Sequence, residues 1–343
     1  MFDNVSSGGN DTSRSAISIP KAAEALTLAI GILSVLFNGT LLIVMTLNSR
    51  QVFASLGSYF IANLAVADLI TGLNSIGWGM NGFHPFSLGV QKALLCVFWI
   101  TVQVSFYTIL VMSTERLIAI VFPFRAALLM SKKKTVLYCV AVWIVAIICA
   151  VFINLECGKT VMFALIVFFE LAIIAIVIEY VFVFRQLRAL WQHSKKRVLH
   201  GKQSSVAASG GCKETSDVQR EYQVTVVVVT LAVILVLTVF PYNLATQVYL
   251  ACELFRPSAC VGREEVLQKF MWYYFPIELL NFVLNPVVYA WRLPKYRKAF
   301  LVTFGLQKSG DGWRSCSSGG SPKTTRSTCP NGNEKRMVLL NCK

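Results

Sequence analysis

Seven long stretches of apolar residues alternate with shorter polar segments along this chain of 343 residues. A helix needs about 20 predominantly apolar residues to cross the hydrocarbon core of a bilayer, and each stretch is long enough. The pattern therefore predicts an all-α membrane protein, a bundle of seven transmembrane helices, with spans at roughly residues 23–48, 56–80, 92–121, 135–155, 161–186, 223–251 and 268–291.

Polar segments flank this predicted membrane domain, which covers residues 23–305. Residues 1–22 form a Gly/Ser/Asn-rich leader that we expect to be extracellular and disordered, and residues 306–343 form a Ser/Thr-rich cytoplasmic tail. The polar loop from about residue 192 to 219 is expected to be mobile. Residues 294–305 place apolar and basic side chains at helical spacing, which predicts a short amphipathic helix on the inner membrane surface.

Composition supports a membrane protein, because 55% of the residues are hydrophobic and only 14% are charged. A soluble domain has too little interior to bury that much apolar surface. The first apolar stretch lacks the short basic start and the small-residue cleavage site of a signal peptide, so we expect it to remain as a span.

Positive charge is concentrated on one side of the predicted spans. The loops after spans two and four carry only Lys92 and Lys159, whereas the opposite loops and the tail carry most other Lys and Arg residues. Positively charged loops stay cytoplasmic, so we expect a multi-pass plasma-membrane protein with its amino end outside and its carboxyl end inside. These basic residues flank spans without interleaved aromatics, which favours contact with anionic membrane lipids over nucleic acid.

Two sequons, at Asn4 and Asn10, lie in the expected extracellular leader and are candidate glycosylation sites.

Asp68 lies in the middle of the second span, where a lone carboxylate costs roughly 2.5–3.5 kcal/mol on insertion scales. We therefore expect it to have polar partners, and the candidates are Ser105, Asn281 and Asn285. The two asparagines are four residues apart and share one helix face. Such a site suits a hydrated Na⁺ or a proton, so Asp68 is a candidate ligand of Na⁺. The alternative is a buried hydrogen-bond network that only fixes helix packing.

Arg116 follows Glu115 at the cytoplasmic end of the third span, and Glu221 opens the sixth. An Arg116–Glu221 pair would hold the two helices together until the sixth moves outward. The alternative is that Arg116 extends toward the lipid headgroups. Pro241 removes a backbone hydrogen bond and kinks the sixth span, which gives that motion a hinge.

These landmarks occur in one order along the chain: Asn38, the LAVAD run ending in Asp68, Ser105, Glu115-Arg116, Trp143, Tyr180, Pro241 and Asn285-Pro286-Val287-Val288-Tyr289. Their combination resembles a class A (rhodopsin-like) G-protein-coupled receptor over roughly residues 23–305. The resemblance implies ligand-driven opening of the inner face and exposure of Arg116 to a heterotrimeric G protein, supported by Tyr180 and Tyr289. It also implies that arrestin and a receptor kinase act on the tail.

The chain departs from the family pattern at several switch positions. Leu117 replaces the aromatic residue after the arginine, Val239 replaces the tryptophan of the sixth span, and Ala172 stands about where the fifth span usually has proline. A short second outer loop and the missing proline resemble the melanocortin/adenosine/lipid-receptor branch.

The cysteines depart from the family pattern as well. The family's outer disulfide joins the top of the third span to the second outer loop, where Cys157 lies. Cys96, however, lies about one and a half turns deeper than usual, and Gln91 occupies the expected place. Cys252 and Cys260 share the third outer loop and are candidates to pair with each other.

The outer half of the bundle is expected to form the ligand pocket. Phe98 stands where amine receptors of this family carry an aspartate, which disfavours an ordinary amine ligand. Glu170 and Glu278 either pair with a cationic ligand group or stay protonated and hydrogen-bonded. The residues we place in the pocket are Trp78, Phe98, Trp99, Val102, Gln103, Glu170, Asn243, Thr246, Tyr274 and Glu278.

The favoured function is therefore a receptor that couples an extracellular small molecule or short peptide to a heterotrimeric G protein. The alternative is a constitutively active or silent receptor-fold partner protein, which the altered switch positions suggest. A transporter would require inverted repeats or broken helices, and an enzyme a set of nucleophile, base and oxyanion donors. We find neither pattern, and we expect no cofactor other than an allosteric Na⁺.

Overall fold

The structure is a computed structural model that describes residues 21–122, 131–153, 158–200, 225–255, 260 and 262–306. The chain divides into two compact units, Met1–Leu306 and Gln307–Lys343, and the second lies outside the described residues. The leader with Asn4 and Asn10, the loop beyond residue 200 with Glu221, and Cys157 lie outside them too.

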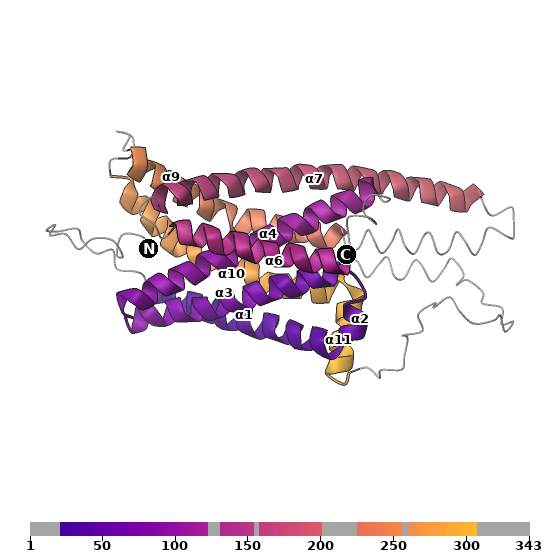
Figure 1. The fold of residues 1–343 in the computed structure, drawn as a ribbon, viewed down its shortest axis with the longest axis horizontal. Coiled ribbons are helices and arrows are strands. Elements are labelled where there is room, and N and C mark those ends of the chain that lie inside the picture. Colours follow the sequence, from indigo (N-terminus) through magenta and orange to yellow (C-terminus); the bar gives the residue numbers. More distant parts are fainter. Residues whose placement is uncertain are drawn as a thin grey trace. The chain divides into compact units, whose positions relative to one another are not determined.

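Helices make up the described part of the chain, which contains no strand. The predicted all-α bundle of seven long helices is confirmed (Figure 1). In chain order the elements are α1 (Lys21–Leu47), α2 (Ser49–Val52), α3 (Gly57–Phe83), α4 (Leu88–Val121), α6 (Lys132–Ile153), α7 (Gly158–His200), the helical residues 225–238, α9 (Phe240–Phe255), α10 (Glu264–Arg292) and α11 (Pro294–Thr303). Below, the end of the bundle where α1 begins is called the N-terminal end, and the end where α10 finishes is called the C-terminal end.

Six helical segments of the described residues are long and apolar enough to cross a membrane, and Thr225–Phe255 counts as one of them. The seventh expected span corresponds to α10, which has 29 residues but carries more polar side chains. This helix packs against α1, α3 and α9. Three polar residues in its middle, Glu278, Asn281 and Asn285, are buried, which explains how a membrane helix can carry them.

α7 extends well beyond the span expected from hydropathy. The sequence predicted a polar loop from about residue 192, and this is wrong for residues 192–200, because the helix continues to His200. The extension is rich in Arg, Leu, Gln and Lys, which are good helix formers in water. Hydropathy marks where a helix leaves the membrane, and it does not mark where the helix ends.

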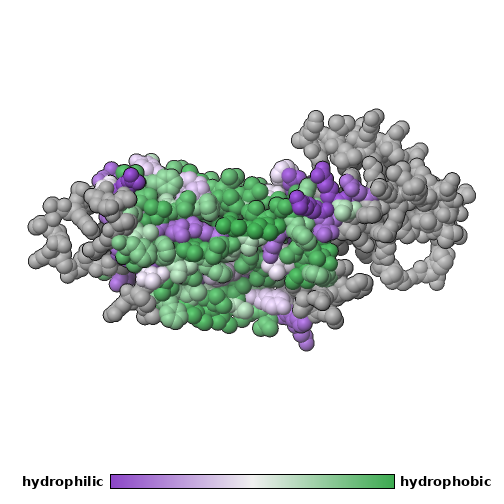
Figure 2. All heavy atoms as spheres, turned by 90° about the horizontal axis from the view of Figure 1, so that it is seen from above, coloured by the Kyte–Doolittle hydropathy of each residue, from purple (hydrophilic) through white to green (hydrophobic). Residues whose placement is uncertain are grey.

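The outer surface of the bundle is apolar. On α6, for example, Leu137, Ile144 and Val151 are each about half exposed or more. On the face drawn in Figure 2, hydrophobic residues cover most of the middle of the helices, and hydrophilic residues gather mainly toward the ends. An apolar surface of this kind fits a lipid environment, since a soluble protein rarely exposes so much.

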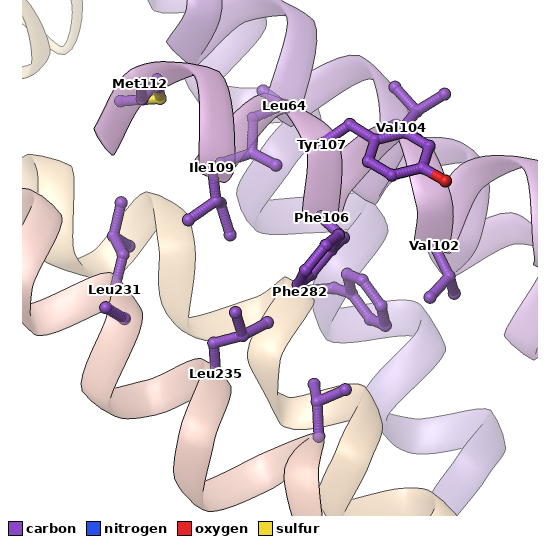
Figure 3. Close-up of a cluster of buried hydrophobic side chains, with 14 of the residues drawn as sticks. Leu64, Val102, Val104, Phe106, Tyr107, Ile109, Met112, Leu231, Leu235 and Phe282 are labelled. Carbon is purple, nitrogen blue, oxygen red and sulfur yellow. The ribbon is translucent and has the colours of Figure 1, made fainter. Parts of the chain in front are cut away.

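α4 runs through the middle of the bundle and contributes many of its buried residues. Figure 3 shows Leu231 and Leu235 of the helical residues 225–238 pointing toward Ile109 and Phe106 of α4, with Phe282 of α10 beside Phe106. The core thus joins α4 to the helical residues 225–238 and to α10.

Close packing of α1 on α3 depends on glycine. A Cβ atom on Gly31 would lie 2.9 Å from the carbonyl oxygen of Gly72, which is too close for any other residue. Small residues at such positions let two membrane helices approach closely. This contact fixes the position of α3 and therefore of Asp68.

α11 is the predicted amphipathic helix, and its bounds, Pro294–Thr303, agree closely with the predicted residues 294–305. It is held to the start of α3 by polar contacts. The Tyr296 hydroxyl donates to the Ser58 Oγ atom at 3.1 Å, and the Lys295 ammonium group donates to the same oxygen at 2.8 Å. Burial raises the pKa of Tyr296, so its hydroxyl stays neutral and available as a donor.

Candidate functional site

Asp68 is completely buried in α3 and bonded from two other helices. The Ser105 hydroxyl of α4 donates to its Oδ1 atom at 2.9 Å, and the Asn285 amide of α10 donates to its Oδ2 atom at 2.8 Å. Both distances are those of well-formed hydrogen bonds. The carboxyl group therefore ties three helices together at the centre of the bundle.

Asn281, the third expected partner of Asp68, is buried but has no hydrogen bond to the carboxyl group in the structure. Its Oδ1 atom has no hydrogen-bond partner, and neither has the Oδ1 atom of Asn285. Buried oxygens of this kind are normally satisfied. Together with the Asp68 carboxyl group these two oxygens offer donors of the kind that hard cations prefer, so the chemistry of these residues fits a small monovalent cation.

Pro286 leaves a backbone carbonyl of α10 without its helical donor, because proline has no N–H. The free oxygen belongs to Phe282, four residues earlier, and the Asn38 side-chain amide of α1 donates to it at 3.0 Å. Asn38 also donates to the backbone oxygen of Ser34 at 3.0 Å. The proline landmark of α10 and the asparagine landmark of α1 therefore form one contact.

At the C-terminal end of α4, Arg116 forms an ion pair with the neighbouring Glu115. Both side chains are mostly buried, with 12% and 6% exposed. The alternative partner Glu221 lies outside the described residues, so the predicted latch remains a prediction. Tyr180 and Tyr289 are buried nearby, and each hydroxyl lacks a hydrogen-bond partner.

Glu179 is a polar residue near this end that the sequence reasoning missed. It lies in α7 next to Tyr180, and the Ser113 hydroxyl of α4 donates to its Oε2 atom at 2.6 Å. The Thr114 hydroxyl makes a longer contact of 3.4 Å with the other carboxyl oxygen. An acidic residue within an apolar span was the available signal.

A cavity of about 20 Å³ lies between α4, α7, α9, α10 and the helical residues 225–238. Five of the residues that we placed in the ligand pocket line it: Phe98, Trp99, Val102, Asn243 and Glu278. The other lining residues are Ser105, Phe106, Phe169, Leu235, Val239, Tyr242, Asn281 and Phe282. The cavity has room for about one water molecule, so a larger ligand must move its walls.

Five other expected pocket residues do not line this cavity: Trp78, Gln103, Glu170, Thr246 and Tyr274. The Gln103 Oε1 atom accepts a long hydrogen bond of 3.4 Å from the Tyr107 hydroxyl of the same helix. Thr246 donates to the backbone oxygen of Tyr242, also within its own helix. Tyr274 donates to the backbone of the neighbouring helix. This cavity therefore does not include these five residues, and their place in a ligand pocket stays a prediction.

Cys252 and Cys260 form a disulfide with a Cα–Cα distance of 5.6 Å, as predicted. Cys96 is a free, half-buried cysteine, which agrees with its unusual depth in α4. The disulfide closes the segment between α9 and α10 at the N-terminal end of the bundle.

Comparison with known proteins agrees with this architecture. Residues 38–160 match the model of the 7 transmembrane receptor (rhodopsin family). The alpha-1A adrenergic receptor of Oryzias latipes is 26% identical over 136 residues, which represent 38% of this chain and 28% of that receptor. The similarity thus spans less than a third of the relative's length. The bundle, the order of its landmarks and these matches together make the chain similar to the rhodopsin family of seven-transmembrane receptors.

Proposed function

We propose that this chain is a G-protein-coupled receptor of the plasma membrane, which converts binding of an extracellular small molecule or short peptide into activation of a heterotrimeric G protein. The proposal rests on Ser105, which belongs both to the cavity wall and to the polar network around Asp68. Its side chain lines the cavity and also donates a hydrogen bond to Asp68. A change in the cavity therefore reaches the central polar network in one step.

The network connects the cavity with the two helices that carry prolines. Asp68 holds Asn285, which precedes Pro286, and Asn281 of the same helix lines the cavity. Pro241 lies where the helical residues 225–238 meet α9. A ligand that displaces the cavity wall would bend both helices near their prolines. The helices are most easily bent there, since a proline removes a backbone hydrogen bond.

Arg116 is the residue that we expect to contact the G protein. In the present structure its charge is neutralised by Glu115, and an ion pair of this kind can act as a two-state contact. Opening of the C-terminal end would release the guanidinium group toward a backbone carbonyl or carboxylate of the partner. The Ser/Thr-rich tail would then serve a receptor kinase and arrestin, because phosphorylation adds charge there.

We also propose that Asp68, Ser105, Asn281 and Asn285 hold an allosteric Na⁺. The fit rests on one carboxyl group and the two amide oxygens that lack hydrogen-bond partners. A single negative charge suits a monovalent cation. Bound there, the ion would favour the arrangement in which the three helices stay together.

The test of receptor function is nucleotide exchange on purified G proteins from each major family, with the receptor reconstituted in nanodiscs. We expect ligand-free exchange above the receptor-free rate for at least one family, and a loss of that excess in Arg116→Ala. In cells, cAMP and Ca²⁺ measured side by side at matched surface expression should identify the same pathway. Equal exchange for wild type and variant in every family would contradict the proposal and favour a silent partner protein.

A further inference from the structure

Glu278 is the only acidic residue among those that line the cavity. Its side chain is 2% exposed, and its Oε2 atom is buried without a hydrogen-bond partner. None of the ion pairs found among the described residues includes it. Glu278 therefore places an unsatisfied carboxyl oxygen at a cavity.

The comparison with Asp68 shows that the bundle can satisfy a buried acid with its own side chains. Both oxygens of the Asp68 carboxyl group receive a hydrogen bond from a neighbouring helix. Burial of an ionised carboxylate without such partners is unfavourable, and membrane proteins keep such residues mainly where they have a functional partner. The bundle satisfies Asp68 by itself, whereas Glu278 is left to a partner from outside the chain.

Aromatic rings form much of the remaining wall. Phe98, Trp99 and Phe106 of α4 face the cavity, together with Phe169 of α7 and Tyr242 of α9. The face of an aromatic ring attracts an organic cation, and the attraction is strongest where water is excluded. An inorganic cation needs several oxygen ligands, and the Na⁺ proposed above takes its ligands from the set around Asp68.

We propose that this cavity binds a ligand through an organic ammonium or guanidinium group, and that Glu278 is the residue that pairs with it. The proposal rests on the proposed receptor function and adds its ligand class. Phe98 and Glu278 both line this cavity, so α4 contributes an aromatic ring to the site and α10 contributes the acid.

The size of the cavity indicates how such a ligand would enter. Phe98 and Phe275 contact each other with ring centroids 5.5 Å apart. Phe275 precedes Glu278 by three residues and so lies about 4.5 Å nearer the N-terminal end. Phe98 also lines the cavity, so Phe275→Ala removes a ring that packs against the cavity wall and should make the site more accessible.

The experiment measures binding without any G protein. The full-length receptor in nanodiscs is heated with phenethylammonium or benzamidinium, or with neutral 2-phenylethanol. We expect both cations, but not the alcohol, to raise the apparent Tm of the wild type. Glu278→Gln should weaken apparent cation affinity by about 30-fold or more, since it removes one partner of a buried charge pair.

Glu179→Gln is the control. Glu179 is also an acid within an apolar span, but it accepts hydrogen bonds from Ser113 and Thr114 and does not line the cavity. The control should bind the cations as the wild type does. The absence of any cation-induced shift, an equal shift with the alcohol, or unchanged affinity in Glu278→Gln would each overturn the proposal.

Two further measurements keep the test decisive. If Glu278→Gln yields no folded receptor, Glu278→Asp keeps the charge but withdraws it by one methylene, and it should bind the cations more weakly than the wild type. Equal binding would overturn the proposal. Nucleotide exchange is measured separately, so cation binding without exchange argues against the receptor function alone, and exchange without cation binding argues against this ligand class alone.

Discussion

The hydroxyl of Tyr274 in α10 donates a hydrogen bond of 2.7 Å to the backbone carbonyl oxygen of Leu237. In a regular helix this oxygen would accept from the residue four positions later, which is Pro241 and has no N–H. A carbonyl without a donor is unfavourable in lipid. Tyr274 therefore supplies the donor that the proline removed, and it ties the kinked helix to α10.

Tyr274→Phe removes only this donor, so we expect the apparent free energy of unfolding to fall by about 0.5–2 kcal/mol. The kink also loses its attachment to α10, and basal nucleotide exchange should rise. Thermal unfolding in nanodiscs and ligand-free exchange check the two effects. Tyr273→Phe is the matched control, because the neighbouring Tyr273 is 62% exposed and should tolerate the change.

A double-mutant cycle identifies the cause. Pro241→Ala restores the backbone N–H, which can then bond to the Leu237 oxygen within the helix. In that background the loss of the Tyr274 hydroxyl should cost clearly less than it does in the wild type. An equal cost in both backgrounds would show that the hydroxyl acts through some other contact.

Ser113→Ala tests the contact between α4 and α7 near the C-terminal end. This change removes the 2.6 Å hydrogen bond to Glu179, and we expect a loss of about 1–2 kcal/mol, reduced from the value for buried charged groups by partial exposure. Thr114→Val removes only the 3.4 Å contact and should cost less than about 0.5 kcal/mol. Similar losses for the two variants in a thermal unfolding assay would rule out this hydrogen bond as the main contact.

The sequence predicted the helices well because hydropathy measures how favourably a segment is transferred from water into lipid. It also predicted two partners of Asp68, since a carboxylate inside a membrane requires polar neighbours and few are available. The disulfide between Cys252 and Cys260 followed from their position in one short segment. In each case one physical requirement left few possible structures or partners.

Residue spacing did not predict the hydrogen bonds that depend on the rotation of a side chain. Helical spacing places Asn281 on the same face as Asn285, but it does not show that only Asn285 reaches Asp68. Residue spacing also did not predict that the Tyr274 hydroxyl bonds to the Leu237 carbonyl oxygen. This contact depends on the relative positions of two helices, which residue spacing within one helix does not determine.

The orientation expected from the basic loops can be tested with the two leader sequons. If the amino end faces outside, Asn4 and Asn10 are exposed to the glycosylation machinery. Glycosidase treatment should then shift the wild-type protein on a gel but leave the Asn4→Gln/Asn10→Gln double variant unchanged. A sequon introduced into the tail serves as the control, and its modification would reverse the proposed topology.

The sodium proposal predicts a stability difference between two salts of equal ionic strength. A site that binds only the folded protein stabilises it by about 1.4 kcal/mol when the ion is present at ten times its Kd. We therefore expect a higher unfolding temperature in NaCl than in KCl for the wild type and no difference for Asp68→Asn. Ser105→Ala should reduce the difference, because it removes a ligand, whereas Ser113→Ala should keep it. A Na⁺ effect that persists in Asp68→Asn would locate the ion elsewhere and leave Asp68 as a packing residue.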